Sequence, residues 1–191
     1  YTSGTTGPSK GAMISHRNLM YTIQLGIPGF DMGPTDEQLS FLPLCHILER
    51  NLTVMIPLRT GATVNFAENL EAVPENIREL QPTIFVAVPR IWEKFYSGVL
   101  ISLKDSGKLQ QAAYGWSIGV GMAIADRVLA GQPVGVWFKL KFALARILAL
   151  DNARKLIGIH RARYLVTGAA PISPDLVRWY LGLGVPMLEV W

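Results

Sequence analysis

The sequence has few cysteines, few charges and no long apolar run. Cys45 is its single cysteine, which excludes an internal disulfide and a cysteine-rich zinc site and is typical of a reducing compartment. Basic residues exceed acidic ones by 18 − 14 = +4 and are spread along the chain, which argues against a nucleic-acid binder built on a basic stripe. The longest charge-free stretch, residues 109–125, contains two glutamines, a serine and three glycines, whereas a transmembrane helix needs about 20 mostly apolar residues. A mildly anionic ligand and a peripheral membrane contact are compatible with this composition.

Half of the 191 residues are hydrophobic, which is enough for one substantial core. The sequence opens at Tyr1 without a methionine or a charged leader, and it stops at Trp191 directly after an apolar stretch. We interpret the chain as a fragment of a longer protein, and the sequence does not support secretion.

Short apolar or β-branched runs alternate with longer helical patterns, which is typical of βαβ units with a mostly parallel sheet. The predicted strands are residues 39–42, 63–66, 83–88, 164–167 and 185–190. Three helices are predicted in the first half of the chain. One precedes the first strand, following an N-cap at Ser15 and ending near Leu25; one covers residues 47–58; and one, with Pro74 in its first turn, precedes the third strand. The expected fold class is therefore α/β with helices beside the sheet.

Strand signals vanish over residues 89–158, where we expect about three helical segments that break near residues 105–107 and 131–135. We interpret this segment as a helical excursion from the sheet. Leu140, Leu144, Ile147 and Leu148 recur on one helical face, and the same segment carries Lys139, Lys141, Arg146, Arg154 and Lys155. Two interpretations stay open: a core-facing helix with a solvated polar side, or a basic amphipathic surface that contacts anionic lipid.

The strongest local signal is the glycine-rich loop, residues 1–11, which reads Y-T-S-G-T-T-G-P-S-K-G. Glycines let backbone N–H groups approach a phosphate, hydroxyls donate hydrogen bonds, and Lys10 supplies a positive charge. One such charge pair at about 4 Å and an effective dielectric near 20 is of order 4 kcal/mol before desolvation. A Walker A loop is disfavoured, because Ser9 stands where it needs glycine and Gly11 where it needs serine or threonine. The loop predicts phosphate binding, and a flexible surface turn is the alternative.

The complete string of the loop closely resembles the Thr-Ser-Gly-Thr-Thr-Gly-x-Pro-Lys-Gly signature of the acyl-adenylate-forming superfamily, with Pro8 one place earlier than usual. The resemblance continues through residues 11–19, 40–50 (S-F-L-P-L-C-H-I-L-E-R), 88–94 (V-P-R-I-W-E-K) and 167–176 (T-G-A-A-P-I-S-P-D-L). Residues 49–50 and 88–94 are similar to the long-chain fatty acyl-CoA synthetases. The resemblance implies a partial AMP-binding domain over residues 1–191, from the N-terminal domain of such an enzyme, with the helical excursion at 89–158 and no C-terminal domain.

The resemblance also implies the residues of a site. Lys10, His46 and Thr6 are the implied catalytic residues, with His46 as a gate between the acyl group, the α-phosphate and the approach path of the thiol. The implied nucleotide-binding positions are Thr2, Ser3, Gly4, Thr5, Thr6, Gly7, Lys10, Gly168, Ala169, Ala170 and Trp191, which packs on adenine; Thr2 is also the implied metal contact. The residues alone favour plainer interpretations: a packed or hydrogen-bonded structural histidine at His46, a strand-to-helix turn before an N-cap at Ser173, and a buried aromatic at Trp92 beside Arg90.

The implied reaction is ATP-dependent activation of a long-chain fatty acid to acyl-AMP and then acyl-CoA, with Mg²⁺ and the glycine-rich loop stabilising the departing pyrophosphate. The implied partners are the fatty acid and CoA, without nucleic acid, and the implied location is the cytoplasm with or without peripheral membrane contact. Family residues that follow the position of Trp191 are absent, so we expect the 191 residues alone to have little or no ligase activity. Adenylation of another carboxylic acid and a non-catalytic nucleotide-binding or membrane-associated module are the alternatives.

Overall fold

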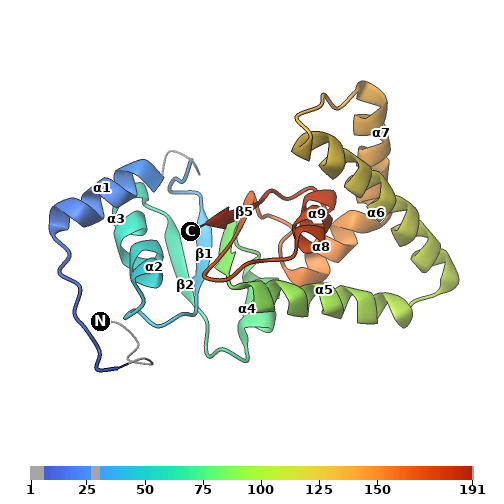
Figure 1. Cartoon of the computed structure of the whole chain (residues 1–191). Coiled ribbons are helices and arrows are strands. Elements are labelled where there is room, and N and C mark those ends of the chain that lie inside the picture. The colour runs from blue at the N-terminus through green and yellow to red at the C-terminus, as the bar shows by residue number, and fades with distance from the viewer. Residues whose placement is uncertain (1–6, 27–30, 191) are drawn as a thin grey trace. The chain divides into compact units, whose positions relative to one another are not determined.

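The computed structural model describes residues 7–26 and 31–190, which divide between Leu70 and Glu71 into two compact units. In both units parallel strands are joined by helices (Figure 1). This confirms the predicted α/β class. The predicted strands are also confirmed, with boundaries that differ by at most two residues.

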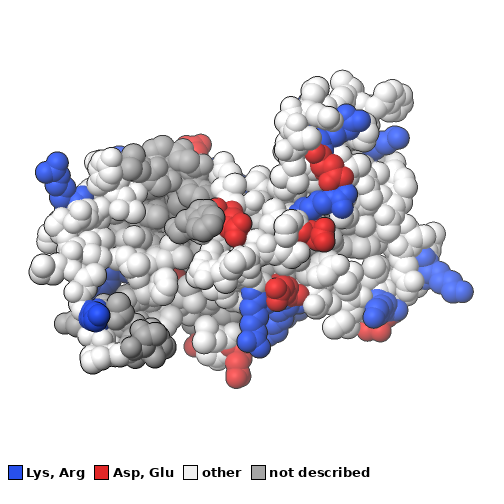
Figure 2. Space-filling view, viewed as in Figure 1, with Lys and Arg blue, Asp and Glu red and all other residues white. Residues whose placement is uncertain are grey.

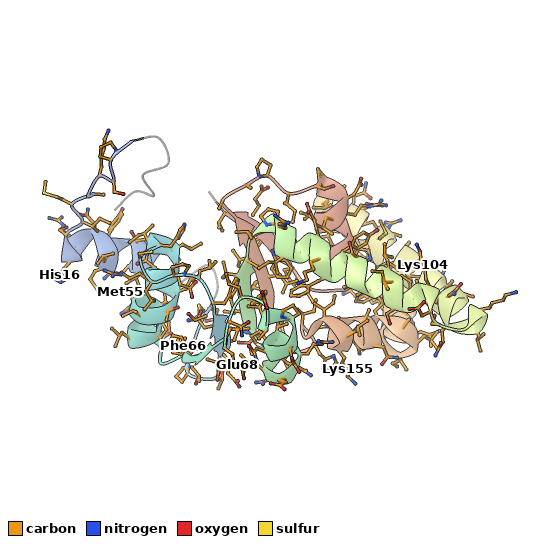
Figure 3. The ribbon with its side chains drawn as sticks, turned by 90° about the horizontal axis from the view of Figure 1, so that it is seen from below. His16, Met55, Phe66, Glu68, Lys104 and Lys155 are labelled. Atoms are coloured by element: carbon orange, nitrogen blue, oxygen red, sulfur yellow. The ribbon has the colours of Figure 1, made fainter. Side chains whose placement is uncertain are left out.

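The first unit contains a two-stranded parallel sheet. Strand β1 (Glu37–Ser40) pairs in register with β2 (Thr63–Phe66), and Phe66 ends β2 with an exposed side chain (Figure 3). The connection between them is one helical run, made of α2 (Ile47–Arg50), the π-helical segment η2 (Asn51–Met55) and α3 (Ile56–Thr60). Gly61 ends this run with a left-handed φ of 74°, which favours glycine. The space also favours glycine, because a Cβ there would lie 3.3 Å from Cγ of Pro34.

Helix α1 (His16–Gly26) precedes this sheet and begins where the sequence predicts. The Ser15 hydroxyl accepts a hydrogen bond from the Asn18 N–H at 3.2 Å, while the Asn18 side chain accepts one from the Ser15 N–H at 3.0 Å. This reciprocal pair satisfies amides that the first turn leaves without partners, so Ser15 is confirmed as the N-cap.

The second unit is built on a three-stranded parallel sheet in the order β3–β4–β5, with β4 in the middle. Its elements are α4 (Val73–Leu80), β3 (Ile84–Ala87), β4 (Tyr164–Gly168), α9 (Pro174–Gly182) and β5 (Met187–Val190). Because both faces of the sheet are covered, β3 and β4 are near-continuous apolar runs, and Phe85 and Leu165 are completely buried.

Between β3 and β4 the chain forms helices only. They are α5 (Pro89–Lys104), α6 (Lys108–Leu129), α7 (Val136–Ala145), the π-helical segment η3 (Arg146–Leu150) and α8 (Asp151–Ile157). The long helix α6 packs against α9, and a Cβ added to Gly121 would overlap the carbonyl oxygen of Gly182. The two backbones therefore approach more closely than any side chain at Gly121 would allow.

Trp92 anchors α5 to the sheet. Its ring is completely buried and meets Phe85 and Tyr180 edge to face, with centroid distances of 5.4 and 5.2 Å. Its indole N–H donates to the Ala87 carbonyl at 3.1 Å, and the Tyr180 hydroxyl donates to the Trp92 carbonyl at 2.8 Å. The structural interpretation of Trp92 is thus confirmed, whereas Arg90 is exposed.

The core-facing interpretation of the leucine-rich face after residue 139 is wrong. Leu140, Leu144, Ile147 and Leu148 are 56%, 50%, 76% and 48% exposed. The packed side of α7 carries Phe138, Phe142 and Ala145 instead, with the Arg127 guanidinium 4.4 Å from the Phe138 ring centre. Periodicity predicted residues that share a face, but α7 is apolar on two sides, so it did not predict which side packs.

Candidate functional site

The glycine-rich loop is described only from Gly7 onward. Thr2, Ser3, Gly4, Thr5 and Thr6 lie outside the described residues, as does Trp191. Gly7 has a φ of 153°, which residues with side chains rarely adopt, and it is exposed together with Pro8, Ser9 and Lys10. The described part of the loop is therefore accessible to a ligand, and its phosphate-binding role stays a prediction.

His46 caps the short helix α2. Its backbone is extended (φ −78°, ψ 126°), and its Nδ1 accepts a hydrogen bond from the Leu48 N–H at 3.3 Å. An accepting Nδ1 carries no proton, so the neutral ring has its proton on Nε2. The side chain is exposed, which makes Nε2–H a donor suited to a phosphate or carboxylate oxygen. This hydrogen bond agrees with the structural interpretation of His46 that the sequence left open, although the sequence did not predict that the residue caps α2. The cap fixes which nitrogen is the donor.

Glu49, one residue before the end of α2, holds this helix to the sheet. Its carboxylate is buried, and Oε1 accepts from the Ser40 hydroxyl at 2.5 Å and from the Thr53 hydroxyl at 2.9 Å. Ser40 is the last residue of β1, so the carboxylate ties α2 to the carboxyl end of that strand. We infer that Glu49 keeps His46 in place, because the two residues share one helical turn.

Sequence reasoning missed this role of Glu49 and treated the residue only as a family marker. The available signal was the spacing of Glu49 and Thr53, four residues apart on one helix face and inside an apolar stretch. The contribution of Ser40 had no such signal, because it comes from a strand on the other side of a loop.

The turn after β4 contains the predicted positions Gly168, Ala169 and Ala170. Gly168 is buried, and a Cβ there would lie 2.9 Å from the carbonyl oxygen of Val190 on β5, so only glycine fits without a shift. Ala169 has a φ of 67°, a left-handed conformation that is strained for alanine. Ala169 and Ala170 are exposed at the carboxyl end of a parallel strand, which is where open α/β sheets bind ligands.

The same turn leads into α9 with Ser173 at the N-cap position, which confirms the strand-to-helix interpretation, although the Ser173 side chain makes no capping bond. Thr167, just before the turn, is completely buried, and its hydroxyl has no hydrogen-bond partner among the described residues. A buried hydroxyl without a partner is costly. Sequence reasoning did not single out Thr167, since burial and pairing are not visible in the sequence.

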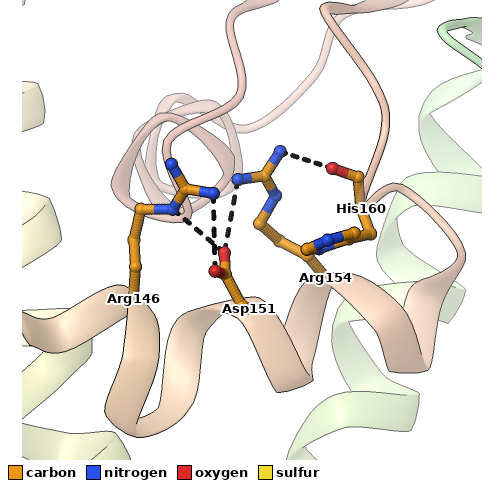
Figure 4. A network of polar contacts seen from close by, with 4 residues as sticks. All are labelled: Arg146, Asp151, Arg154 and His160. Carbon is orange, nitrogen blue, oxygen red and sulfur yellow. Dashed lines mark hydrogen bonds and ion pairs between the residues drawn. The ribbon is translucent and has the colours of Figure 1, made fainter. Parts of the chain in front are cut away.

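A charged network lies elsewhere in the second unit, on η3, α8 and the turn that follows α8 (Figure 4). Asp151 is bound by Arg146 at 3.0 Å and by Arg154 at 3.5 Å, and Arg154 donates to the His160 carbonyl at 2.8 Å. Burial and the neighbouring Arg154 charge lower the pKa of His160. The network closes the turn between α8 and β4, and we assign it a structural role.

Comparison with known proteins identifies this arrangement. Residues 1–191 match the family model described as AMP-binding enzyme. The chain belongs to the AMP-binding enzyme family. This family member is 34% identical over its whole length to the long-chain-fatty-acid–CoA ligase ACSBG2 of Gallus gallus, and 31% identical to the putative fatty-acid–CoA ligase fadD11 of Mycobacterium tuberculosis strain CDC 1551. It spans 26% and 34% of those two proteins.

A solved structure shows the fold of this AMP-binding family member. The inhibitor-bound N-terminal domain of FACL13 from Mycobacterium tuberculosis superimposes on this chain with a TM-score of 0.60 and 21% identity. The match covers 100% of this chain and 35% of the FACL13 chain. The fold is therefore that of the N-terminal domain of acyl-CoA synthetase-like enzymes. Within the described ranges, no group of three or more histidine, cysteine or acidic side chains could hold a metal ion, and no helix is long and apolar enough to cross a membrane.

Proposed function

We propose that the whole protein is a long-chain fatty acid–CoA ligase, which activates the acid with ATP to acyl-AMP and then forms acyl-CoA. The observation that carries this proposal is the 34% identity to a long-chain-fatty-acid–CoA ligase across the entire chain, within a family match over the same residues. The relatives are about three to four times longer than this chain, so the activity belongs to the whole protein.

In the proposed reaction the fatty acid carboxylate attacks the α-phosphorus of ATP and pyrophosphate leaves. Lys10 and the hydroxyls and N–H groups of residues 2–7 bind the phosphates and stabilise the negative charge that develops on the leaving group. His46 donates from Nε2 to an oxygen near the reacting carboxylate, and Glu49 holds it there through α2. The small residues at 168–170 leave room for the nucleotide, and Trp191 stacks on its base.

Mg²⁺ binds mainly to substrate phosphates and retains several waters; the hydroxyl of Thr2 would be one of its protein ligands, and the ion would neutralise phosphate charge. CoA enters the second step as a substrate. We place the protein in the cytoplasm, in peripheral contact with a membrane; the single cysteine of these 191 residues, Cys45, is exposed and forms no disulfide, which supports a reducing compartment.

Fatty-acid-dependent exchange of pyrophosphate into ATP by the whole protein tests the proposal. We expect exchange with a long-chain fatty acid and none with amino acids or aromatic acids. Lys10→Ala should lower kcat/KM for ATP by about a hundredfold, as loss of a transition-state donor does. Lys108→Ala, which removes an exposed lysine from the start of α6, is the matched control and should leave the rate unchanged. Absence of exchange with every fatty acid would overturn the proposal.

A further inference from the structure

The outward side of α7 is apolar where a surface helix normally carries polar residues. Val136, Leu140, Leu144 and Ile147 form one stripe at i, i+4, i+8 and i+11, with Trp137 beside it, and we call these five residues the α7 outer face. The most exposed of the five are Val136, Trp137 and Ile147, whose exposed fractions are 74%, 76% and 76%. Because the other side of α7 already packs inward, this face has no partner among the described residues.

Within the chain segment that carries the α7 outer face, all charged residues have one sign. Residues 127–150 contain four basic residues and no acidic one. Lys139 and Lys141 precede and follow Leu140, so they stand about 100° to either side of it, at both margins of the stripe. Both are exposed, and neither makes an ion pair within the part of the chain that the structure describes. Their aliphatic stems can lie along the apolar face while their amines reach anionic groups above it.

The face also ends at a protruding tip. Helices α6 and α7 pack as a hairpin that projects at the top right of Figure 1. Figure 2 shows a largely uncharged surface there, with basic groups at its edges and acidic groups at its base. Leu129 and Trp137 lie near the turn of this hairpin and are 62% and 76% exposed. Tryptophan is the side chain that favours the boundary between lipid headgroups and acyl chains.

We propose that the α7 outer face is a membrane-binding surface that lies in the headgroup region of an anionic bilayer, with Trp137 at the acyl boundary and Lys139 and Lys141 on lipid phosphates. Lys139 and Lys141 at the margins give this face the charge that complements an anionic surface, and the apolar stripe gives it affinity for acyl chains. A lipid surface satisfies the stripe and the lysines together. The inference deepens the proposed membrane contact by naming its surface and lipid, and it does not depend on the ligase activity.

Co-sedimentation of the whole protein with vesicles tests this surface. We expect binding to phosphatidylcholine vesicles that contain one third phosphatidylserine, weaker binding to phosphatidylcholine alone, and loss of binding at high salt. Lys139→Gln with Lys141→Gln should weaken partitioning roughly thirtyfold, because each lysine near an anionic surface is worth about a fivefold change. Leu140→Glu with Leu144→Glu should abolish it.

The matched control is Leu109→Glu, an equally apolar and 84% exposed position at the other end of α6, which should bind vesicles like the unaltered protein. An Ala143→Cys variant in which the exposed Cys45 is replaced by serine distinguishes a lipid-bound face from one covered by protein. The added thiol should react with maleimide in solution and be protected by vesicles. Three outcomes would each overturn the inference: the whole protein does not bind vesicles, the α7 variants bind vesicles as well as the unaltered protein, or the thiol at position 143 is unreactive without vesicles. Pyrophosphate exchange with a detergent-dispersed fatty acid should persist in the α7 variants, so failure here is distinct from failure of the ligase proposal.

Discussion

Replacement of Glu49 by alanine should damage both stability and catalysis, because one buried carboxylate links α2 to β1. A hydrogen bond to a charged group contributes about 1.5–3 kcal/mol, and Glu49 accepts two, from Ser40 and Thr53. These two hydroxyls lie 3.0 Å apart and can still bond each other, so part of the loss is recovered. We expect Glu49→Ala to lower the free energy of unfolding by about 2–3 kcal/mol.

The catalytic consequence of Glu49→Ala is separable from the loss of stability. Below the unfolding transition, kcat for fatty-acid-dependent pyrophosphate exchange should fall about tenfold or more through misplacement of His46, while KM for ATP changes little. Glu49→Gln keeps an acceptor oxygen at the same position and should recover most of the rate. Glu79→Ala, an exposed position on α4, is the control.

Urea unfolding and steady-state exchange by the whole protein are the assays. Full kcat in a folded Glu49→Ala variant would refute the positioning role. An unchanged free energy of unfolding would refute the buried network itself.

Three further changes test the packing. Gly121→Ala should destabilise the second unit by about 1–3 kcal/mol, because the added Cβ would overlap the backbone of Gly182. Gly119→Ala, at a position on the same helix with open space around it, should stabilise the unit by up to about 1 kcal/mol. Equal effects of the two changes on urea unfolding would contradict this. Gly168→Ala should lower the melting temperature by forcing β4 from Val190, and an unchanged thermal transition would count against that close approach. Burial raises the pKa of Tyr114 to about 12, so its contribution to stability is complete below pH 10 and lost as pH rises from 10 to 12. Tyr114→Phe should therefore reduce the fall in the free energy of unfolding between pH 10 and 12. The same fall in the variant and in the unaltered protein would show that Tyr114 does not cause it.

The strands were predictable because buried parallel strands leave a plain pattern. Residues 84–87 and 164–168 are short apolar runs bounded by proline, glycine or charged residues, and few other structures produce that pattern. The orientation of α7 was not predictable, since Phe138 and Leu140 are equally apolar and only packing against α6 decides which one is buried.

The site was predictable in its residues and not in its supports. The glycine-rich loop and His46 stand in a local string that resembles a known signature, so sequence alone nominates them. The bond between Glu49 and Ser40 joins a helix to a strand across a loop, and the buried hydroxyl of Thr167 acquires its environment from neighbouring strands. Such contacts are tertiary, so no local spacing reveals them.

The fate of labelled oxygen tests most directly whether this protein attaches a fatty acid to AMP. The whole protein is incubated with ATP, CoA and a long-chain fatty acid whose carboxylate carries ¹⁸O, and the released nucleotide is analysed by mass spectrometry. Attack of the carboxylate on the α-phosphorus places one ¹⁸O in AMP, which is the result we expect. Label in inorganic phosphate beside ADP, or AMP without label, would contradict the adenylation chemistry.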